Sequence, residues 1–162
     1  MGESDLALAS GTDAGMPLES KTFRYDTELT WRGGRSCEVT AGQRPPILVV
    51  PPADFPGGED GDWSPEHLFL ASLQSCTMLS FLAHCAHSGV EVVSYRSQAS
   101  GDLSRREEDR RYAFQRIALI INVVVAGGHA PLAQSLTDKA HRDCFITAST
   151  TAEVEAAWRI TE

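Results

Sequence analysis

The chain has 162 residues, enough for one domain that buries a hydrophobic core without metal ions or disulfide bonds as cross-links. Acidic residues outnumber basic ones, with 22 Asp and Glu against 14 Lys and Arg, and the formal net charge is -8. Since no basic run offers a surface for a polyanion, we expect no nucleic-acid partner and favour small molecules or proteins.

The N-terminal segment is polar and rich in Gly and Ser, so we expect residues 1–20 to form a disordered tail and residues 21–162 to form a single domain. The tail carries acidic residues where a secretory signal has Lys or Arg, and its apolar run "LALA" is short. The longest apolar stretch, residues 68–86, is interrupted by Ser, Gln and His, which suits a buried helix better than a membrane span. We therefore expect a cytoplasmic protein without membrane contact, whose 4 cysteines are reduced thiols at rest.

The first predicted elements are strands. "TFRYDTELTW" and "SCEVTA" flank Gly33 and Gly34, a pattern typical of a hairpin, and "PILVV" predicts a third strand that ends at two prolines. The Gly- and Asp-rich segment 53–62 follows, an acidic loop of the kind that often borders a binding site.

A long helix comes next. Ser64 is a typical N-cap, Pro65 suits the first helical position, and Gly89 is the expected end. The apolar sequence between them predicts a central helix that is covered on every side.

The second half of the sequence predicts two long strands, a helix and a final strand, at residues 91–103, 113–125, 131–144 and 155–160. The charged stretch "SRREEDRR" forms the turn between the two long strands, and "TASTTAEV" extends the helix. The order βββ-α-ββ-α-β predicts an α+β fold with a mainly antiparallel sheet.

The cysteines differ in their surroundings. Cys76 lies in "SLQSCT", where small polar neighbours leave room for a substrate and supply hydrogen bonds, although the composition alone also fits a core residue. Cys144 follows His141 and Arg142, a setting that favours the thiolate. Cys37 and Cys85 are expected to be buried small hydrophobes.

Three segments together resemble the OsmC/Ohr family of thiol-dependent hydroperoxide reductases. They are "WSPEHLFLASLQSCTMLSFL", the Gly-Gly-Arg that ends at Arg35, and "KAHRDCFI". The resemblance implies an OsmC-like α+β fold and an intertwined homodimer, with Cys76 as the peroxidatic and Cys144 as the resolving cysteine. It also implies that Glu66 holds an arginine in the site, with Arg35 as the first choice and Arg32 as its rival.

One position departs from the family pattern. Many members follow the second cysteine with proline, whereas Phe145 and Ile146 follow Cys144 here. This difference indicates a divergent branch of the family.

The chemistry explains the residue types. A thiolate attacks the peroxide bond, and a second thiol must capture the sulfenic acid as a disulfide before it is over-oxidised. Cys76 lies well inside its helix, where the helix dipole is weak, so an arginine is expected to activate it. We expect no cofactor and no metal ion, because the histidines do not gather three or four ligands.

Helix geometry leaves two arrangements open. Glu66 and Cys76 are about 15 Å apart on a straight helix, too far to line one small pocket. Either the helix is broken near residues 70–74, or Glu66 serves the site of a second subunit.

The favoured function is therefore a peroxidase that reduces organic hydroperoxides and is regenerated by a dithiol such as a lipoyl group, as the resemblance implies. Two alternatives stay open. One is a non-catalytic relative that senses redox state or binds a hydrophobic ligand, and the other is a thiol enzyme that acts on a disulfide or an electrophile.

Overall fold

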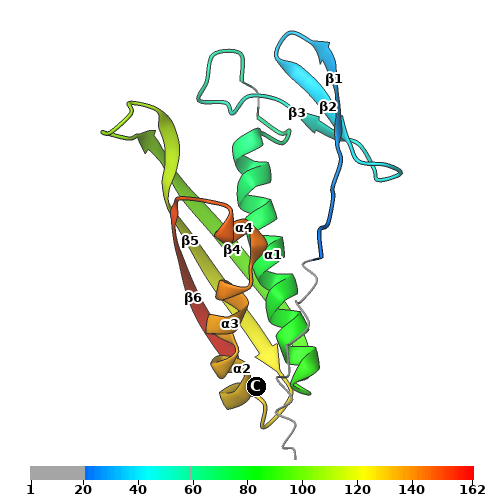
Figure 1. The fold of residues 1–162 in the computed structure, drawn as a ribbon, viewed down its shortest axis with the longest axis vertical. Coiled ribbons are helices and arrows are strands. Elements are labelled where there is room, and N and C mark those ends of the chain that lie inside the picture. The colour runs from blue at the N-terminus through cyan, green and yellow to red at the C-terminus, as the bar shows by residue number, and fades with distance from the viewer. Residues whose placement is uncertain (1–20, 59) are drawn as a thin grey trace, which may run out of the picture.

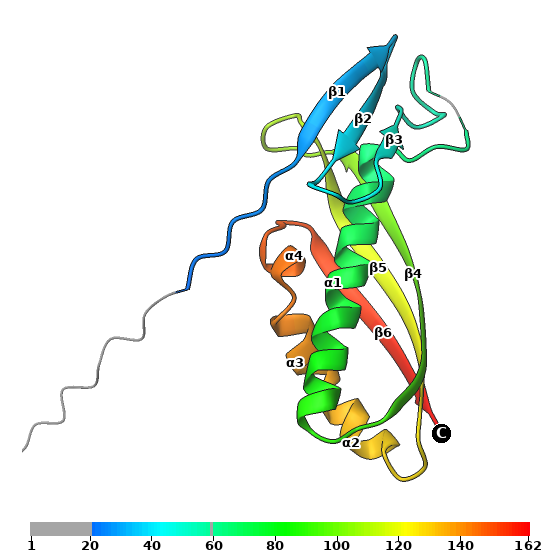
Figure 2. The same ribbon diagram turned by 90° about the vertical axis from the view of Figure 1, so that its right-hand side faces the viewer.

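The structure is a computed structural model that describes residues 21–58 and 60–162, so the tail predicted for residues 1–20 lies outside the described residues. The predicted α+β fold is confirmed (Figures 1 and 2). The strands are β1 (Glu28–Gly33), β2 (Ser36–Thr40), β3 (Ile47–Val49), β4 (Val92–Arg105), β5 (Tyr112–Val125) and β6 (Glu153–Thr161). The helices are α1 (Pro65–His87), α2 (Ala130–Ser135), α3 (Thr137–Arg142) and α4 (Phe145–Ala148).

The described strands form two three-stranded sheets rather than one, in the orders β1-β2-β3 and β4-β5-β6. Three of the four strand pairings are antiparallel, as predicted, but β6 runs parallel to β5. The parallel pairing follows from the connection, because α2, α3 and α4 carry the chain back along the sheet before β6 begins. The β1–β3 sheet lies at the N-terminal end of α1, where Val50 N–H donates to Trp63 O at 2.9 Å (Figure 1).

The helix α1 begins and ends where the sequence predicts. Ser64 Oγ accepts the N–H of His67 at 3.2 Å, and Pro65 occupies the first turn, where no N–H is needed. Gly89 follows the last turn with φ 71°, a left-handed conformation that glycine adopts without strain. By length and composition α1 could cross a membrane, but core helices satisfy the same criteria, and one stripe of α1 is buried in this fold.

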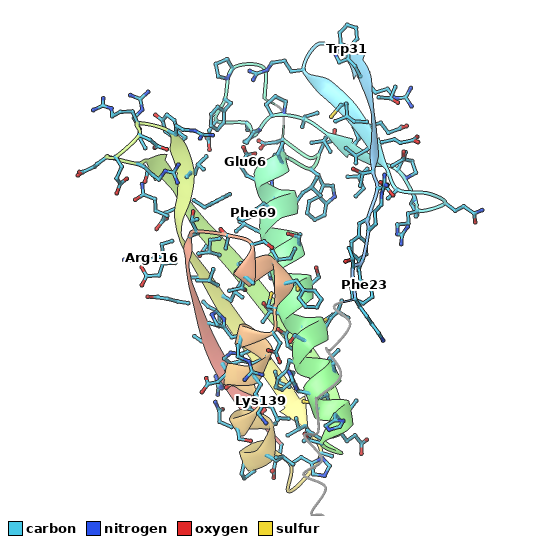
Figure 3. All side chains as sticks on the ribbon, viewed as in Figure 1. Phe23, Trp31, Glu66, Phe69, Arg116 and Lys139 are labelled. Carbon is cyan, nitrogen blue, oxygen red and sulfur yellow. The ribbon has the colours of Figure 1, made fainter. Side chains whose placement is uncertain are left out.

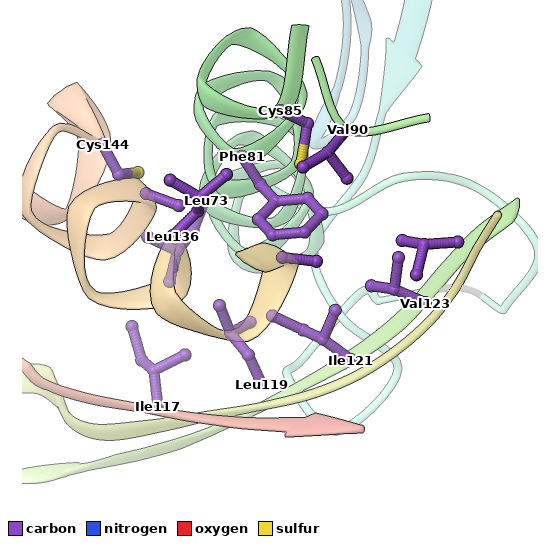
Figure 4. Packing of buried hydrophobic residues seen from close by; sticks show 13 residues of the cluster. Leu73, Phe81, Cys85, Val90, Ile117, Leu119, Ile121, Val123, Leu136 and Cys144 are labelled. Carbon is purple, nitrogen blue, oxygen red and sulfur yellow. The ribbon is translucent and has the colours of Figure 1, made fainter. Parts of the chain in front are cut away.

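The core lies between that stripe of α1 and the β4–β6 sheet (Figure 4). Alternate residues of β5 point toward the helix, namely Ile117, Leu119, Ile121, Val123 and Val125. Phe81 is fully buried against them, which stabilises the fold by about 1.5–3 kcal/mol, and its ring centroid lies 4.9 Å from that of Trp158.

Two boundaries differ from the prediction. The first strand begins only at Glu28, because its partner β2 ends at Thr40, directly opposite Glu28. The single helix predicted for residues 131–144 is divided at Leu136 into α2 and α3. The short helix α4 is separate from them, since Cys144 adopts an extended backbone conformation with ψ 110° that interrupts helical geometry.

Candidate active site: a thiol pair between α1 and α4

Cys76 and Cys144 are brought together by the packing of α1 against α3 and α4. Cys76 lies near the middle of α1 and is partly exposed, whereas Cys144 is fully buried at the N-cap of α4. The two thiols lie close enough for each to shift the pKa of the other: their interaction raises the pKa of Cys76 and lowers that of Cys144. Two thiols from distant parts of the chain therefore form a neighbouring pair in a single subunit.

Two threonines surround the buried sulfur. The backbone N–H of Thr147 donates to Cys144 Sγ at 3.5 Å, and the Thr77 hydroxyl lies 3.6 Å from the same atom. Cys144 thus occupies the position that Ser, Thr or Asp takes at most helix N-caps.

The two sulfurs ionise differently. Burial raises the pKa of Cys76, and the backbone N–H groups of Ile146 and Phe145 offset only part of this effect. Burial opposes ionisation of Cys144 as well, but hydrogen bonds from Thr147, Thr77 and Cys76 outweigh it, so the pKa of Cys144 lies below its usual value. Within one chain Cys144 therefore ionises more readily than Cys76, whereas the sequence predicted that an arginine ionises Cys76.

Arg35 and Glu66 lie together, but at the N-terminal end of α1. Both line a cavity of about 490 Å³, whose walls also include Trp31, Cys37 and Phe55. The Arg35 guanidinium donates to Pro56 O, and Glu66 Oε2 is buried without a hydrogen-bond partner. The expected Arg35–Glu66 ion pair is absent among the described residues.

Arg32, the rival of Arg35, is engaged elsewhere. Its Nη2 atom binds Glu38 Oε1 at 2.6 Å on the hairpin, and it does not line the cavity that holds Glu66. Of the two arginines, Arg35 is therefore the one that lines the same cavity as Glu66.

The helix between Glu66 and Cys76 is unbroken, since α1 runs as one α-helix over Pro65–His87. The arrangement with a break near residues 70–74 is therefore excluded. Glu66 remains about 15 Å along the axis from Cys76 of its own chain.

The family described as OsmC-like protein matches residues 57–159. The chain belongs to the OsmC-like protein family. No curated protein matches it.

Solved structures share the OsmC-like fold at low sequence identity. An OsmC-like protein of unknown function from Vibrio cholerae is 23% identical with a TM-score of 0.77, covering 85% of this chain and 100% of its own. An organic hydroperoxide resistance protein from Elizabethkingia anophelis is 20% identical with a TM-score of 0.69, covering 88% and 98%. The organic hydroperoxide resistance protein OhrB of Bacillus subtilis is 19% identical with a TM-score of 0.60, covering 85% and 98%. These likenesses show the fold.

His84, Asp143 and Arg142 form a polar cluster beside the thiol pair of Cys76 and Cys144, which was not predicted from the sequence. His84 Nε2 lies 2.9 Å from Asp143 Oδ2, and Arg142 binds both carboxylate oxygens of Asp143 at 2.7 and 3.0 Å. The hydrogen bond from Arg142 is the main reason that the pKa of Asp143 lies below its usual value. The cluster links α1 to the residue directly before Cys144.

The other two cysteines stand apart from the pair. Cys85 is buried in the core, as predicted, and burial raises its pKa. Cys37 is only half-buried and lines the cavity of Arg35 and Glu66, so the prediction of a fully buried residue is wrong there. Within residues 21–58 and 60–162, no three His, Cys, Asp or Glu side chains gather as a metal site would require.

Proposed function

We propose that the protein is a thiol-dependent peroxidase that reduces organic hydroperoxides through Cys76 and Cys144. The observation that carries the proposal is the proximity of a partly exposed thiol on α1 and a buried thiol at α4, each of which shifts the pKa of the other. Family membership and the likeness to organic hydroperoxide resistance proteins from Elizabethkingia anophelis and Bacillus subtilis support a reaction with organic hydroperoxides.

The oxidative steps use both sulfurs. The Cys76 thiolate attacks the terminal oxygen of the hydroperoxide, the O–O bond breaks, and the alkoxide leaves as an alcohol after taking a proton. Cys76 is then a sulfenic acid, which the Cys144 thiolate attacks to form the disulfide, and hydroxide leaves as water. The Cys144 sulfur is suited to this attack because its surroundings favour the thiolate.

A homodimer would complete the site. Arg35 and Glu66 cannot reach Cys76 of their own chain, so a second copy is proposed to bring its Arg35 to the thiol pair, where the guanidinium stabilises the Cys76 thiolate.

Exposed apolar side chains support this assembly. Phe23, Tyr25, Leu29 and Trp31 are 65–85% exposed along the N-terminal segment and β1, and Leu79 of α1 is 61% exposed. Figure 3 shows Phe23 and Trp31 on the opposite side of α1 from Arg116 of β5. Such a surface is typical of an interface rather than of a monomer. A monodisperse monomer in light scattering would contradict the homodimer.

The walls of the Arg35 cavity bear on the choice of substrate. Trp31, Val49 and Phe55 give the Arg35 cavity apolar walls, which suit alkyl or lipid hydroperoxides better than hydrogen peroxide. A dithiol such as a lipoyl group is the proposed reductant, and the cytoplasm, where thiols are kept reduced, is the proposed location.

Steady-state turnover tests the proposal. Purified protein should consume cumene hydroperoxide with dihydrolipoamide as reductant, and faster than it consumes hydrogen peroxide. Cys76→Ser should abolish turnover, whereas Cys85→Ala, a core substitution on the same helix, should retain it. No consumption of either peroxide by folded wild-type protein would contradict the proposal.

A non-catalytic redox sensor is the second candidate, because the pKa of Cys76 is raised rather than lowered within one chain. A sensor would form the disulfide once with each added hydroperoxide but would not turn over with the dithiol. Repeated turnover excludes this candidate.

A further inference from the structure

The two sulfurs of the pair differ in access. Cys144 has no exposed surface and is enclosed by the Thr77 hydroxyl and the Thr147 N–H, whereas Cys76 is partly exposed. An external thiol can therefore approach only one end of a Cys76–Cys144 disulfide without displacing the protein around it.

The Thr77 hydroxyl has two acceptors within reach. Its oxygen lies 2.9 Å from Leu73 O, one turn earlier on α1, and 3.6 Å from Cys144 Sγ. A hydroxyl carries a single proton, so it donates to one acceptor at a time. Thr77 is itself 1% exposed, so water cannot replace this hydrogen bond. A rotation about one bond moves the donor from the carbonyl to the sulfur when negative charge appears there.

The two sulfurs have different roles when the reductant cleaves the disulfide. We propose that the reductant attacks Cys76 of the disulfide and expels Cys144, whose charge the Thr77 hydroxyl and the Thr147 N–H receive. Thr77 acts through Cys144 and is therefore a positioning residue. This inference rests on the disulfide of the proposed function.

Reduction of the disulfide takes place in two thiol–disulfide exchanges. A thiolate of the dithiol forms a bond to Cys76 Sγ, the Cys76–Cys144 bond breaks, and Cys144 leaves as a thiolate. The second thiolate of the dithiol then attacks the mixed disulfide at the reductant's sulfur, closes a cyclic disulfide and releases Cys76 as a thiolate, which takes up a proton. The dithiol loses two electrons and the protein disulfide gains them. Since the leaving thiol with the lower pKa departs faster, the lowered pKa of Cys144 supports this direction.

The first experiment locates the mixed disulfide. The full-length protein is oxidised with diamide, so that the disulfide is formed without any peroxide. Excess 2-mercaptoethanol is added, the exchange is quenched in acid during the first turnover, and the adduct is mapped by peptide mass. We expect the adduct on Cys76 and a free thiol at Cys144.

Each other outcome is informative. An adduct on Cys144, or the absence of any Cys76–Cys144 disulfide after diamide, overturns the inference. If the disulfide forms with diamide but hydroperoxide is never turned over, the proposed peroxidase is contradicted while the adduct position still decides the inference.

The second experiment tests Thr77 with a matched pair. Thr77→Val keeps the shape but loses the hydroxyl, and Thr77→Ser keeps the hydroxyl. We expect Thr77→Val to slow reduction of the disulfide by dihydrolipoamide about tenfold, the usual weight of one hydrogen bond to a charged group, and Thr77→Ser to restore the rate.

A titration separates this role from a structural one. In a Cys76→Ser background, Thr77→Val should move the ionisation midpoint of Cys144 upward by about one pH unit, and Thr77→Ser should not. Equal rates and equal midpoints for the two Thr77 variants would overturn the role of Thr77.

Discussion

Glu66 and Cys76 lie on one unbroken helix, about 15 Å apart along its axis. Arg35 lines the same cavity as Glu66, so both residues are remote from the thiol pair of their own chain. An arginine activates a thiol only at short range, because its field is screened over longer distances. The proposed peroxidase therefore requires that each site combine Cys76 and Cys144 of one subunit with Arg35 and Glu66 of another.

Subunit complementation tests this arrangement. Arg35→Ala and Cys76→Ser dimers should each be nearly inactive, because both of their sites lack one group. A heterodimer purified with two tags should contain one intact site and show about half of the wild-type turnover. An inactive heterodimer would show that the two residues act within one chain. Arg32→Ala serves as the control and should remain active, since Arg32 is paired with Glu38.

Substitutions of Phe145 test the effect of the backbone N–H groups near Cys76 on its pKa. Phe145→Pro removes an N–H that lowers the pKa of Cys76, while Cys144 already has the extended backbone that precedes proline and residue 145 is the first of α4. We expect the pKa of Cys76 to rise and its reaction with hydroperoxide to slow about threefold. Phe145→Ala keeps the N–H and should titrate as the wild type does; the same shift in both variants would assign the effect to the lost ring.

His84 tests the link between α1 and the segment that carries Cys144. His84→Ala removes the 2.9 Å contact with Asp143, so the segment before Cys144 is held less firmly against α1. We expect disulfide formation to slow on the order of tenfold and sulfinic acid to accumulate at Cys76 in excess hydroperoxide, measured by intact mass. His87→Ala, at the exposed end of the same helix, is the control. Identical sulfinic acid yields in the two variants would rule out a positioning role for His84.

Because Tyr95 is partly buried, we expect the free energy of unfolding to fall at high pH. Burial raises the pKa of this tyrosine from 10.0 to about 12, an effect that Ser97 partly opposes. Between these values the unfolded chain has released the proton and the folded chain keeps it, so the free energy of unfolding falls as pH rises from 10 to about 12. Tyr95→Phe should flatten this part of the curve, measured by denaturant unfolding at several pH values. Parallel curves for the two proteins would contradict the prediction.

The fold could be predicted wherever the signals are local. Ser64, Pro65 and Gly89 define both ends of α1, and the strand runs of β4 and β5 were located within a few residues. The separate helix α4 was missed because its start depends on Cys144, and cysteine is not among the residues that usually mark a helix N-cap. The division at Leu136 was missed because leucine carries no signal for a helix end.

The candidate site could be predicted only in part. The two cysteines were singled out by resemblance, but their contact depends on how α1 packs against α3 and α4, which spacing along the chain does not encode. The roles of Thr77 and Asp143 depend on the same packing, so no sequence pattern predicted them. The direction of the pKa of Cys76 was also missed, because burial within one chain outweighs its hydrogen bonds.

The most direct test of the peroxidase proposal counts thiols after one equivalent of cumene hydroperoxide, by intact mass and thiol labelling, in the wild type, Cys76→Ser and Cys144→Ser. The account predicts that the wild type loses two thiols to a single Cys76–Cys144 disulfide, while Cys144→Ser accumulates sulfenic or higher acids at Cys76. Survival of every thiol in the folded wild-type protein would contradict it.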